Sequence, residues 1–402
     1  MTSNSITKLA SIAFSGSIIG RGFRYLVLVV IARGINAEAL GLFTFGMVVM
    51  KAGGVFARAG LDSAATKYIP IFNSSDDQAS LVGTVLICLL APFVLGIGVG
   101  AIVFVLDMFV GIHLLQSETT QLFVFGIPLF ASMSVGIAVT RGFKESKYGV
   151  YIRDFGQSGL GLILISYAAF IVGDINAVVI AYLVSLLVGV GLSIFYLVRL
   201  GGVSLSVEPK FKTRKIFLFA IPLLAVTTTQ YLMSWTDILL LGVLVPPSKV
   251  GYYQAAFQTS VLLLVILQSF NSVFPSIAAD LYDNGKMETL QQTYTGVTKW
   301  ASILTITGGA FLLAFSQQIL SLFGSDFVAA RSVFFLLIAG QMVAVIVGPT
   351  SALLAMVGQE RLELVNTVSV TILNIILNLT LINEFGILGA AIATSFSISL
   401  IN

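Results

Sequence analysis

The stretch LVGTVLICLLAPFVLGIGVGAIVFVL, residues 81–106, contains no charged side chain. At 1.5 Å per residue, a helix of this length is about 39 Å long. The hydrocarbon core of a bilayer is roughly 30 Å thick. The stretch therefore predicts a helix that crosses a membrane.

Comparable stretches recur along the whole chain, which has 402 residues. Hydrophobic residues make up 57% of the sequence and charged residues 10%, with a mean hydropathy of +1.02. A soluble domain carries roughly 25% charged residues. The composition thus excludes a soluble fold and predicts an all-α polytopic membrane protein. Twelve spans are expected, at residues 9–32, 39–57, 81–106, 119–140, 155–172, 176–198, 216–244, 251–275, 300–323, 332–357, 364–382 and 386–402.

The last predicted span stops at Asn402 without a Lys or Arg at its far end, so we expect it to be truncated and more helices to follow. The widest basic stretch separates six spans on either side. It predicts an N-terminal lobe at 1–198, a cytoplasmic linker at 199–215 and an incomplete C-terminal lobe at 216–402. Because six is an even number, the two lobes would share one orientation, related by a pseudo-twofold axis along the membrane normal.

The positive charges are distributed unevenly between the predicted loops. With the N-terminus inside, 15 of the 21 Lys and Arg residues lie in inner segments, three in outer loops and three within predicted spans. Cationic loops resist translocation, so this bias predicts a multi-pass protein of the cell membrane with a cytoplasmic N-terminus.

Covalent catalysis is poorly supported by the residues. The chain has one cysteine, Cys88, within an apolar run, and one histidine, His113, in a short predicted loop. A disulfide, a thiolate metal cluster and a Ser/His constellation are therefore excluded within this chain. Walker-type phosphate loops are also absent from the sequence. We predict a protein that is not an enzyme and that uses no cofactor, metal or nucleic-acid partner.

Four ionisable residues fall within predicted spans: Arg21, Arg24, Lys51 and Asp237. Such groups are costly at membrane depth and usually functional. Arg21 and Arg24 share a helical face, and the rise per residue places Lys51 at a similar depth on the next helix. One acid cannot neutralise three cations, so the site would favour an anion such as a phosphate or pyrophosphate.

Other interpretations of these charges stay open. The cations could instead snorkel towards the interface or pack against helix carbonyls. Asp237 could be a counter-ion, an interfacial residue or a site for a coupling ion, H⁺ or Na⁺. Uncharged polar residues also gather on helix faces, at Gln254 and Gln258 on one span and at Asn374 on another. They would bind sugar hydroxyls, or hold helices together through amide hydrogen bonds in lipid.

Several short motifs resemble prokaryotic polysaccharide flippases, which belong to the multidrug/oligosaccharidyl-lipid/polysaccharide exporter superfamily. In the first half they are Ala32-Arg33-Gly34, Gly41-Leu42-Phe43, Gly60-Leu61-Asp62 and Lys67-Tyr68-Ile69. In the second half they are Asp237-Ile238-Leu239-Leu240-Leu241-Gly242, Val250-Gly251-Tyr252-Tyr253 with Ala255, and Phe274-Pro275 before Leu290. Lys67 departs from the pattern, since many members have arginine there.

The resemblance implies two six-helix lobes that face each other in a V and open alternately to either side. It also implies a flippase that carries an isoprenoid-phosphate- or pyrophosphate-linked oligosaccharide among membrane lipids, with Arg21, Arg24 and Lys51 as cavity cations. The alternative is an H⁺- or Na⁺-coupled multidrug or metabolite antiporter of the same superfamily. A membrane-embedded glycan polymerase or ligase is disfavoured, because the predicted outer loops are short.

Overall fold

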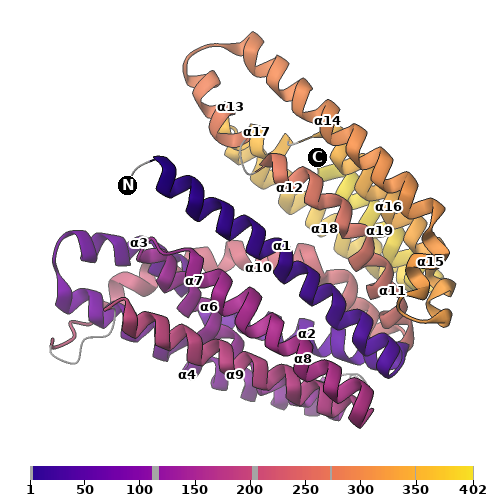
Figure 1. The fold of residues 1–402 in the computed structure, drawn as a ribbon, viewed down its shortest axis with the longest axis horizontal. Helices are drawn as coiled ribbons and strands as arrows, with labels where there is room; N and C mark the ends of the chain where they lie inside the picture. Colours follow the sequence, from indigo (N-terminus) through magenta and orange to yellow (C-terminus); the bar gives the residue numbers. More distant parts are fainter. Residues whose placement is uncertain (1–2, 111–116, 202–206, 272–273, 349, 402) are drawn as a thin grey trace. The chain divides into compact units, whose positions relative to one another are not determined.

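The computed structural model describes residues 3–110, 117–201, 207–271, 274–348 and 350–401. Figure 1 traces the helices. The described residues are helical, joined by short turns, and no strand occurs among them. Their contacts divide the chain into two compact units, Met1–Tyr231 and Leu232–Asn402. The predicted loop histidine, His113, lies outside the described residues.

The N-terminal unit contains long helices interrupted by two π-helical segments. Its elements are α1 (Ser3–Gly34), α2 (Ala37–Arg58), α3 (Leu61–Ser74), α4 (Gln78–Val110), α5 (Glu118–Val124), α6 (Gly126–Gly142), α7 (Lys147–Val150), the π-helix η1 (Tyr151–Gly159), α8 (Leu160–Tyr167), the π-helix η2 (Ala168–Val172), α9 (Ile175–Arg199) and the first part of α10 (Thr213–Leu244).

The C-terminal unit starts within α10 and ends with a helical hairpin. Its further elements are α11 (Pro247–Ser260), η3 (Val261–Leu263), α12 (Leu264–Asn271), α13 (Phe274–Asp283), α14 (Met287–Ala314), α15 (Ser316–Ser321), η4 (Ser325–Ala330), α16 (Arg331–Val347), α17 (Thr350–Met356), α18 (Glu360–Phe385) and α19 (Ile387–Ile401). Within this unit, α19 packs between α18 and α16.

Ten helical runs in the described part of the chain are long and apolar enough to cross a membrane. The prediction of an all-α polytopic membrane protein is therefore confirmed, whereas the count of twelve stays a prediction. Helix α1, which carries Arg21 and Arg24, is 32 residues long but is not among the ten. The two compact units divide within α10, and the predicted lobe and linker boundaries stay predictions.

Helix α2 is the most deeply buried of the membrane-length helices in the N-terminal unit. Its most apolar window is 78% buried, against 11% for α10. Glycines allow this close packing: a methyl group on Gly46, Gly53 or Gly54 would collide with the side chains of α5 and α6. Small residues at such contacts let membrane helices approach closely, where lipid offers no hydrophobic driving force. The glycines therefore let α2 pack closely against α5 and α6.

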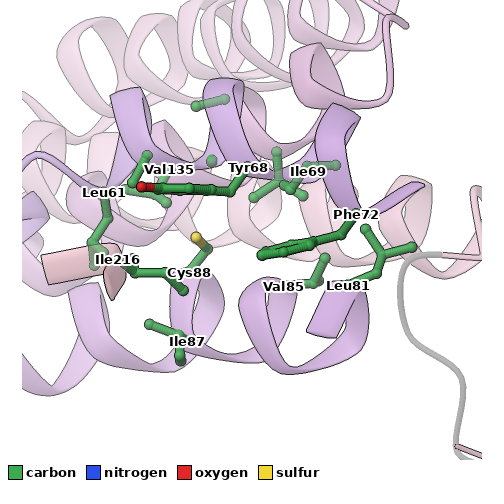
Figure 2. Packing of buried hydrophobic residues seen from close by; sticks show 14 of the residues in the cluster. Leu61, Tyr68, Ile69, Phe72, Leu81, Val85, Ile87, Cys88, Val135 and Ile216 are labelled. Atoms are coloured by element: carbon green, nitrogen blue, oxygen red, sulfur yellow. The ribbon is translucent and has the colours of Figure 1, made fainter. Parts of the chain in front are cut away.

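The segment between the second and third predicted spans forms a helix, α3, which we did not predict from the sequence. One face of α3 packs on α4, α6 and the start of α10 (Figure 2). The cluster includes Leu61, Tyr68, Ile69, Phe72, Leu81, Val85, Cys88, Val135 and Ile216. Cys88, which the sequence places within an apolar run, is fully buried in this cluster. This packing fixes α3 beside the end of α2.

Candidate functional site

A tight turn between α2 and α3 brings charged residues together. Ala59 and Gly60 both adopt left-handed backbone conformations, with φ of 47° and 73°. The turn leaves Arg58 and Asp62 four residues apart, and Arg58 Nη1 lies 3.1 Å from Asp62 Oδ2. Arg58 Nε also donates to the carbonyl of Gly54 at 3.3 Å. The Arg58 guanidinium is thus held by two contacts, through Nε and through Nη1.

Beside this turn is a cavity of about 390 Å³, which we call the basic cavity. Its size falls within the roughly 300–1,000 Å³ typical of ligand sites. Four cationic side chains contribute to its wall, and Asp62 is the one acid among the described residues that line it. The lining residues are Arg58, Asp62, Ser63, Thr66, Lys67, Ser134, Ala138, Arg141 and Arg153. The wall therefore carries a formal excess of positive charge.

The cations of the basic cavity differ in how they are held. Lys67 Nζ lies 3.8 Å from the centroid of the Phe219 ring, a cation–π contact that leaves its N–H groups available. Arg141 and Arg153 are exposed and form no ion pair within 4 Å among the described residues. Arg58 alone is neutralised locally, by Asp62. The cavity can therefore offer uncommitted donors to an anion.

Ser134 gives a second, independent indication of a ligand. It lines the basic cavity and is only 4% exposed. Its hydroxyl has no hydrogen-bond partner among the described residues. Buried polar atoms are usually paired, so an unpaired one in a cavity wall suits a ligand acceptor.

Arg24 does not lie in the basic cavity wall but pairs with an acid on η1. Its Nη1 lies 2.9 Å from Asp154 Oδ1 and 3.3 Å from the Ser158 hydroxyl. A methyl group on Gly20, one turn earlier in α1, would collide with the Asp154 carboxylate. The glycine thus allows α1 and η1 to approach closely enough for the ion pair to form.

Two of the predicted cations, Arg24 and Lys51, lie in the same charged region, and Arg21 lies on the helix that carries Arg24. Lys51, on α2, is partly buried and experiences the positive charges of Arg24 and Arg153. Arg21 lies one turn from Arg24 on α1 with an exposed side chain. Arg153 and Asp154 are consecutive in η1, so this π-helix connects the basic cavity to the Arg24 pair.

The other predicted residues lie in the C-terminal unit. Asp237, on α10, is 4% exposed, and its Oδ2 accepts a hydrogen bond of 2.6 Å from the Tyr253 hydroxyl. Its Oδ1 accepts from the backbone N–H of Ile238. The Tyr253 hydroxyl also lies 3.3 Å from the Thr394 hydroxyl of α19. Asp237 is therefore a buried acid within a polar network, without an ion pair among the described residues.

The predicted amides continue this polar interior. Asn374 donates to the Ser397 hydroxyl of α19 at 3.0 Å and accepts from Asn378. Gln254 is buried on α11, and its carbonyl oxygen has no partner among the described residues. Gln258 is partly buried. Helix α19 thus contacts both the Asp237 network and the Asn374 pair.

Reasoning from the sequence missed Asp154 as the partner of Arg24. It counted Arg58, Arg141 and Arg153 only among the cations of the inner segments, and beyond that count it considered Lys67 only as a departure from a family motif. Most of these residues lie at predicted helix ends, where a charge is ordinary. One signal could have revealed the cavity: the spacing of Arg58 and Asp62 on either side of Gly60. The remaining contacts join segments about 70 to 130 residues apart, so spacing alone could not locate them.

Comparison with known families supports the assignment of the fold. The family description "Polysaccharide biosynthesis protein" matches residues 6–279, and the description "MatE" matches residues 222–380. Among solved structures, an inward-facing MATE family multidrug transporter aligns with a TM-score of 0.72 at 17% identity, over 98% of this chain and 95% of that one. The lipid II flippase MurJ, in an inward closed conformation, aligns with a TM-score of 0.69 at 14% identity, over 98% and 86%.

Two curated relatives come from Haloferax volcanii. The "probable low-salt glycan biosynthesis flippase Agl15" is 27% identical, over 96% of this chain and 79% of its own length. The "probable flippase AglR" is 31% identical, over 42% of this chain and 36% of its own length. The structural likenesses establish the transporter fold, and the family match covers most of the chain. The chain therefore belongs to the polysaccharide biosynthesis protein family, and its fold is similar to those of a MATE transporter and of MurJ.

Proposed function

We propose that the chain is a flippase that moves an anionic, isoprenoid-phosphate-linked oligosaccharide from the cytoplasmic to the outer face of the cell membrane. It works by alternating access and serves surface polysaccharide or glycoprotein glycan assembly. The observation that carries the proposal is the basic cavity, with four cations and a single acid in its described wall. The names of Agl15 and AglR support the same assignment.

A phosphate or pyrophosphate matches the donors that this cavity offers. Arginine presents a planar fork of N–H groups that fits phosphate oxygens, and lysine adds a point charge. Arg141 and Arg153 are available for such contacts, and the unpaired Ser134 hydroxyl could donate to the same group. A neutral sugar would not require this excess of positive charge, so the linking phosphate is the part of the substrate assigned to the cavity.

The excess of basic inner segments favours a cytoplasmic N-terminus, which would place the basic cavity towards the cytoplasm. Substrate would then load from the side where it is made. Outward movement of about two negative charges under an inside-negative potential releases roughly 4 to 5 kcal/mol per 100 mV if the charges cross the full field. The membrane potential therefore acts in the direction of export.

Ion coupling is assigned to the C-terminal unit. Asp237 is buried and bound by Tyr253 and a backbone N–H, with no cation opposite it among the described residues. A buried carboxylate without an ion-pair partner favours binding H⁺ or Na⁺. We assign Asp237 as the residue through which an ion gradient could drive return of the empty carrier.

The second candidate is an antiporter for organic cations. The MatE match to residues 222–380 and the buried Asp237 favour it. The excess positive charge of the basic cavity disfavours it, because a cationic cargo would be repelled there. A non-enzymatic transporter accounts for the relatives' names better than a polymerase or ligase does.

The test uses purified protein reconstituted in vesicles, with a fluorescent isoprenyl pyrophosphate that carries a disaccharide as the probe. The Arg141→Ala/Arg153→Ala variant should bind the probe at least about 100-fold more weakly, since each charge-assisted hydrogen bond contributes about 1.5–3 kcal/mol. Flipping should fall in parallel. The matched control is Arg199→Ala, an exposed arginine at the end of α9 outside the cavity.

Wild-type binding and flipping in the double variant would remove the basic cavity from the mechanism. Transport of ethidium by the wild-type protein, together with an inert pyrophosphate probe, would overturn the flippase assignment in favour of the antiporter. Loss of function in the Arg199→Ala control as well would show that general loss of surface charge, and not the cavity, explains the result.

A further inference from the structure

The segment at residues 207–215, which leads into α10, concentrates positive charge, and we call it the basic segment. It contains four cations and a single acid, Glu208. The cations are Lys210, Lys212, Arg214 and Lys215, and none of them is among the described residues that line the basic cavity. The proposed transport site therefore does not account for this charge.

The basic segment is bound to the first turns of α4. The backbone N–H of Lys210 donates to the carbonyl of Ala79 at 2.8 Å. A methyl group on Gly83 would collide with the Lys210 carbonyl, so the two backbones are in close contact. Lys212 Nζ lies 3.0 Å from Asp77 Oδ2, which neutralises one of the four cations. These contacts fix the place at which the segment presents its other cations.

Three cations of the basic segment keep donors available for a ligand. Lys210, Arg214 and Lys215 are exposed and form no ion pair within 4 Å in the part of the chain that the structure describes. Lys215 Nζ lies 5.4 Å from the centroid of the Tyr68 ring, a cation–π contact that orients the side chain and leaves its charge without an acid. The segment can therefore bind an anion.

The position of these cations on α10 indicates which kind of anion fits. Helix α10 has 32 residues, about 48 Å at 1.5 Å per residue, and is longer than a hydrocarbon core of roughly 30 Å. Arg214 precedes Leu218 by four residues and Ile221 by seven, so the three side chains share one helix face. Leu218 is 75% exposed and Ile221 59%. An exposed apolar face that ends in cations matches a phospholipid, with acyl chains beside the apolar residues and a phosphate beside the cations.

We propose that Lys210, Arg214 and Lys215 form a binding site for the phosphate of an anionic membrane phospholipid. The acyl chains of that lipid lie along the apolar face of α10. The arginine fork binds two phosphate oxygens, and the lysines add point charges. The inference goes beyond the proposed function and does not depend on the transported substrate, because the three cations lie outside the described wall of the basic cavity.

The test titrates the purified full chain in a neutral detergent with dioctanoyl phosphatidylglycerol and, separately, with dioctanoyl phosphatidylcholine. Wild type should bind the phosphatidylglycerol, and its melting temperature should rise because the lipid binds the folded state. Phosphatidylcholine, whose headgroup has no net charge, should bind far more weakly.

The Lys210→Gln/Arg214→Gln/Lys215→Gln variant should bind phosphatidylglycerol about 100-fold more weakly, since each cation near an anionic lipid contributes about a factor of five. Without lipid it should melt as wild type does, because exposed charges contribute little to stability. Its affinity for the isoprenyl pyrophosphate–disaccharide probe should also be unchanged.

The matched control, Lys286→Gln/Lys299→Gln/Arg361→Gln, removes three exposed cations from the C-terminal unit and should bind phosphatidylglycerol as wild type does. Equal affinity of wild type for the two lipids, unchanged phosphatidylglycerol affinity in the basic-segment variant, or an equal loss in the control would each overturn the inference. A basic-segment variant that keeps phosphatidylglycerol but loses the pyrophosphate probe would assign the segment to the substrate, and this too would overturn it.

Discussion

Gly60 packs directly against the backbone carbonyl of Ala220, so the α2–α3 turn is held against the start of α10. Glycine meets two requirements at this position. It has no Cβ to collide with the Ala220 carbonyl, and it adopts the left-handed φ of 73° without strain. Arg58 and Asp62 flank this turn and enter the wall of the basic cavity. The shape of the cavity thus depends on a residue that carries no side chain.

Substitution of Gly60 by alanine should destabilise the N-terminal unit. The left-handed backbone and the collision with Ala220 together should cost about 2 to 5 kcal/mol. The matched control is Gly173→Ala, which has a φ of 72° but open space around it and should cost about 1 kcal/mol. Thermal unfolding in detergent measures both; equal losses would contradict the role of the Ala220 contact.

Substitution of Gly20 by alanine should separate Arg24 from Asp154, because the added methyl group would occupy the position of the Asp154 carboxylate. We expect probe affinity to fall about tenfold, as for loss of one charge-assisted hydrogen bond. The neighbouring Gly22 has open space, so Gly22→Ala should bind as wild type does. A Gly20→Ala protein with unchanged affinity would show that the pair is not needed for binding.

Asp77, between α3 and α4, should make the stability of the N-terminal unit depend on pH in the acid range. Hydrogen bonds from Ser80, and then from Lys212, lower the pKa of the Asp77 carboxyl to about 2. An unfolded chain has a pKa of about 3.9 for aspartate. The stabilisation is therefore complete above about pH 4 and is lost as the pH falls through about 2. The Asp77→Asn substitution keeps a side-chain oxygen that can accept from the Ser80 backbone N–H at the start of α4, but it removes the negative charge.

The wild-type protein should therefore melt above Asp77→Asn at pH 5, and the difference should shrink steadily between about pH 4 and pH 2. Melting curves of the two proteins in detergent at several pH values test this. A difference that stays constant across the range would mean that Asp77 does not titrate with the lowered pKa.

Asp237→Asn should uncouple transport from an ion gradient. The variant can keep the hydrogen bond to Tyr253 but cannot take up a proton or bind Na⁺ as a carboxylate. Flipping rates in vesicles with and without imposed H⁺ or Na⁺ gradients give the measurement. The control is Asp326→Asn, an exposed acid of η4 in the same unit. If the variant still responds to a gradient as wild type does, the coupling site lies elsewhere.

The sequence was enough to predict a membrane protein, because that class depends on the hydrophobicity summed over each segment. Hydrophobic length decides whether a helix can cross a bilayer, and residues 81–106 meet that requirement whatever their neighbours are. The assignment of Arg24 to a membrane span stays a prediction, since α1 is not among the ten helical runs long and apolar enough to cross a membrane in the described part of the chain.

The arrangement of the functional groups could not be predicted in this way. Asp154 lies 130 residues from Arg24, and the walls of the basic cavity combine α2, α3, α6 and η1. A one-dimensional pattern carries no information on which helix faces meet. The amphipathic helix α3 was also missed, because it is too short and too polar to span a membrane.

The sequence by itself determined that this protein is a helical membrane protein with cations in its N-terminal half. Hydropathy, and the free energy of placing a charged side chain in a membrane, are properties of each segment alone. Only the tertiary structure decided which cations are neutralised and which stay available. Whether a cation is neutralised depends on its distance from an acid, and that distance is often set between segments far apart in the sequence. Close packing at Gly20 and Gly60 sets such distances here.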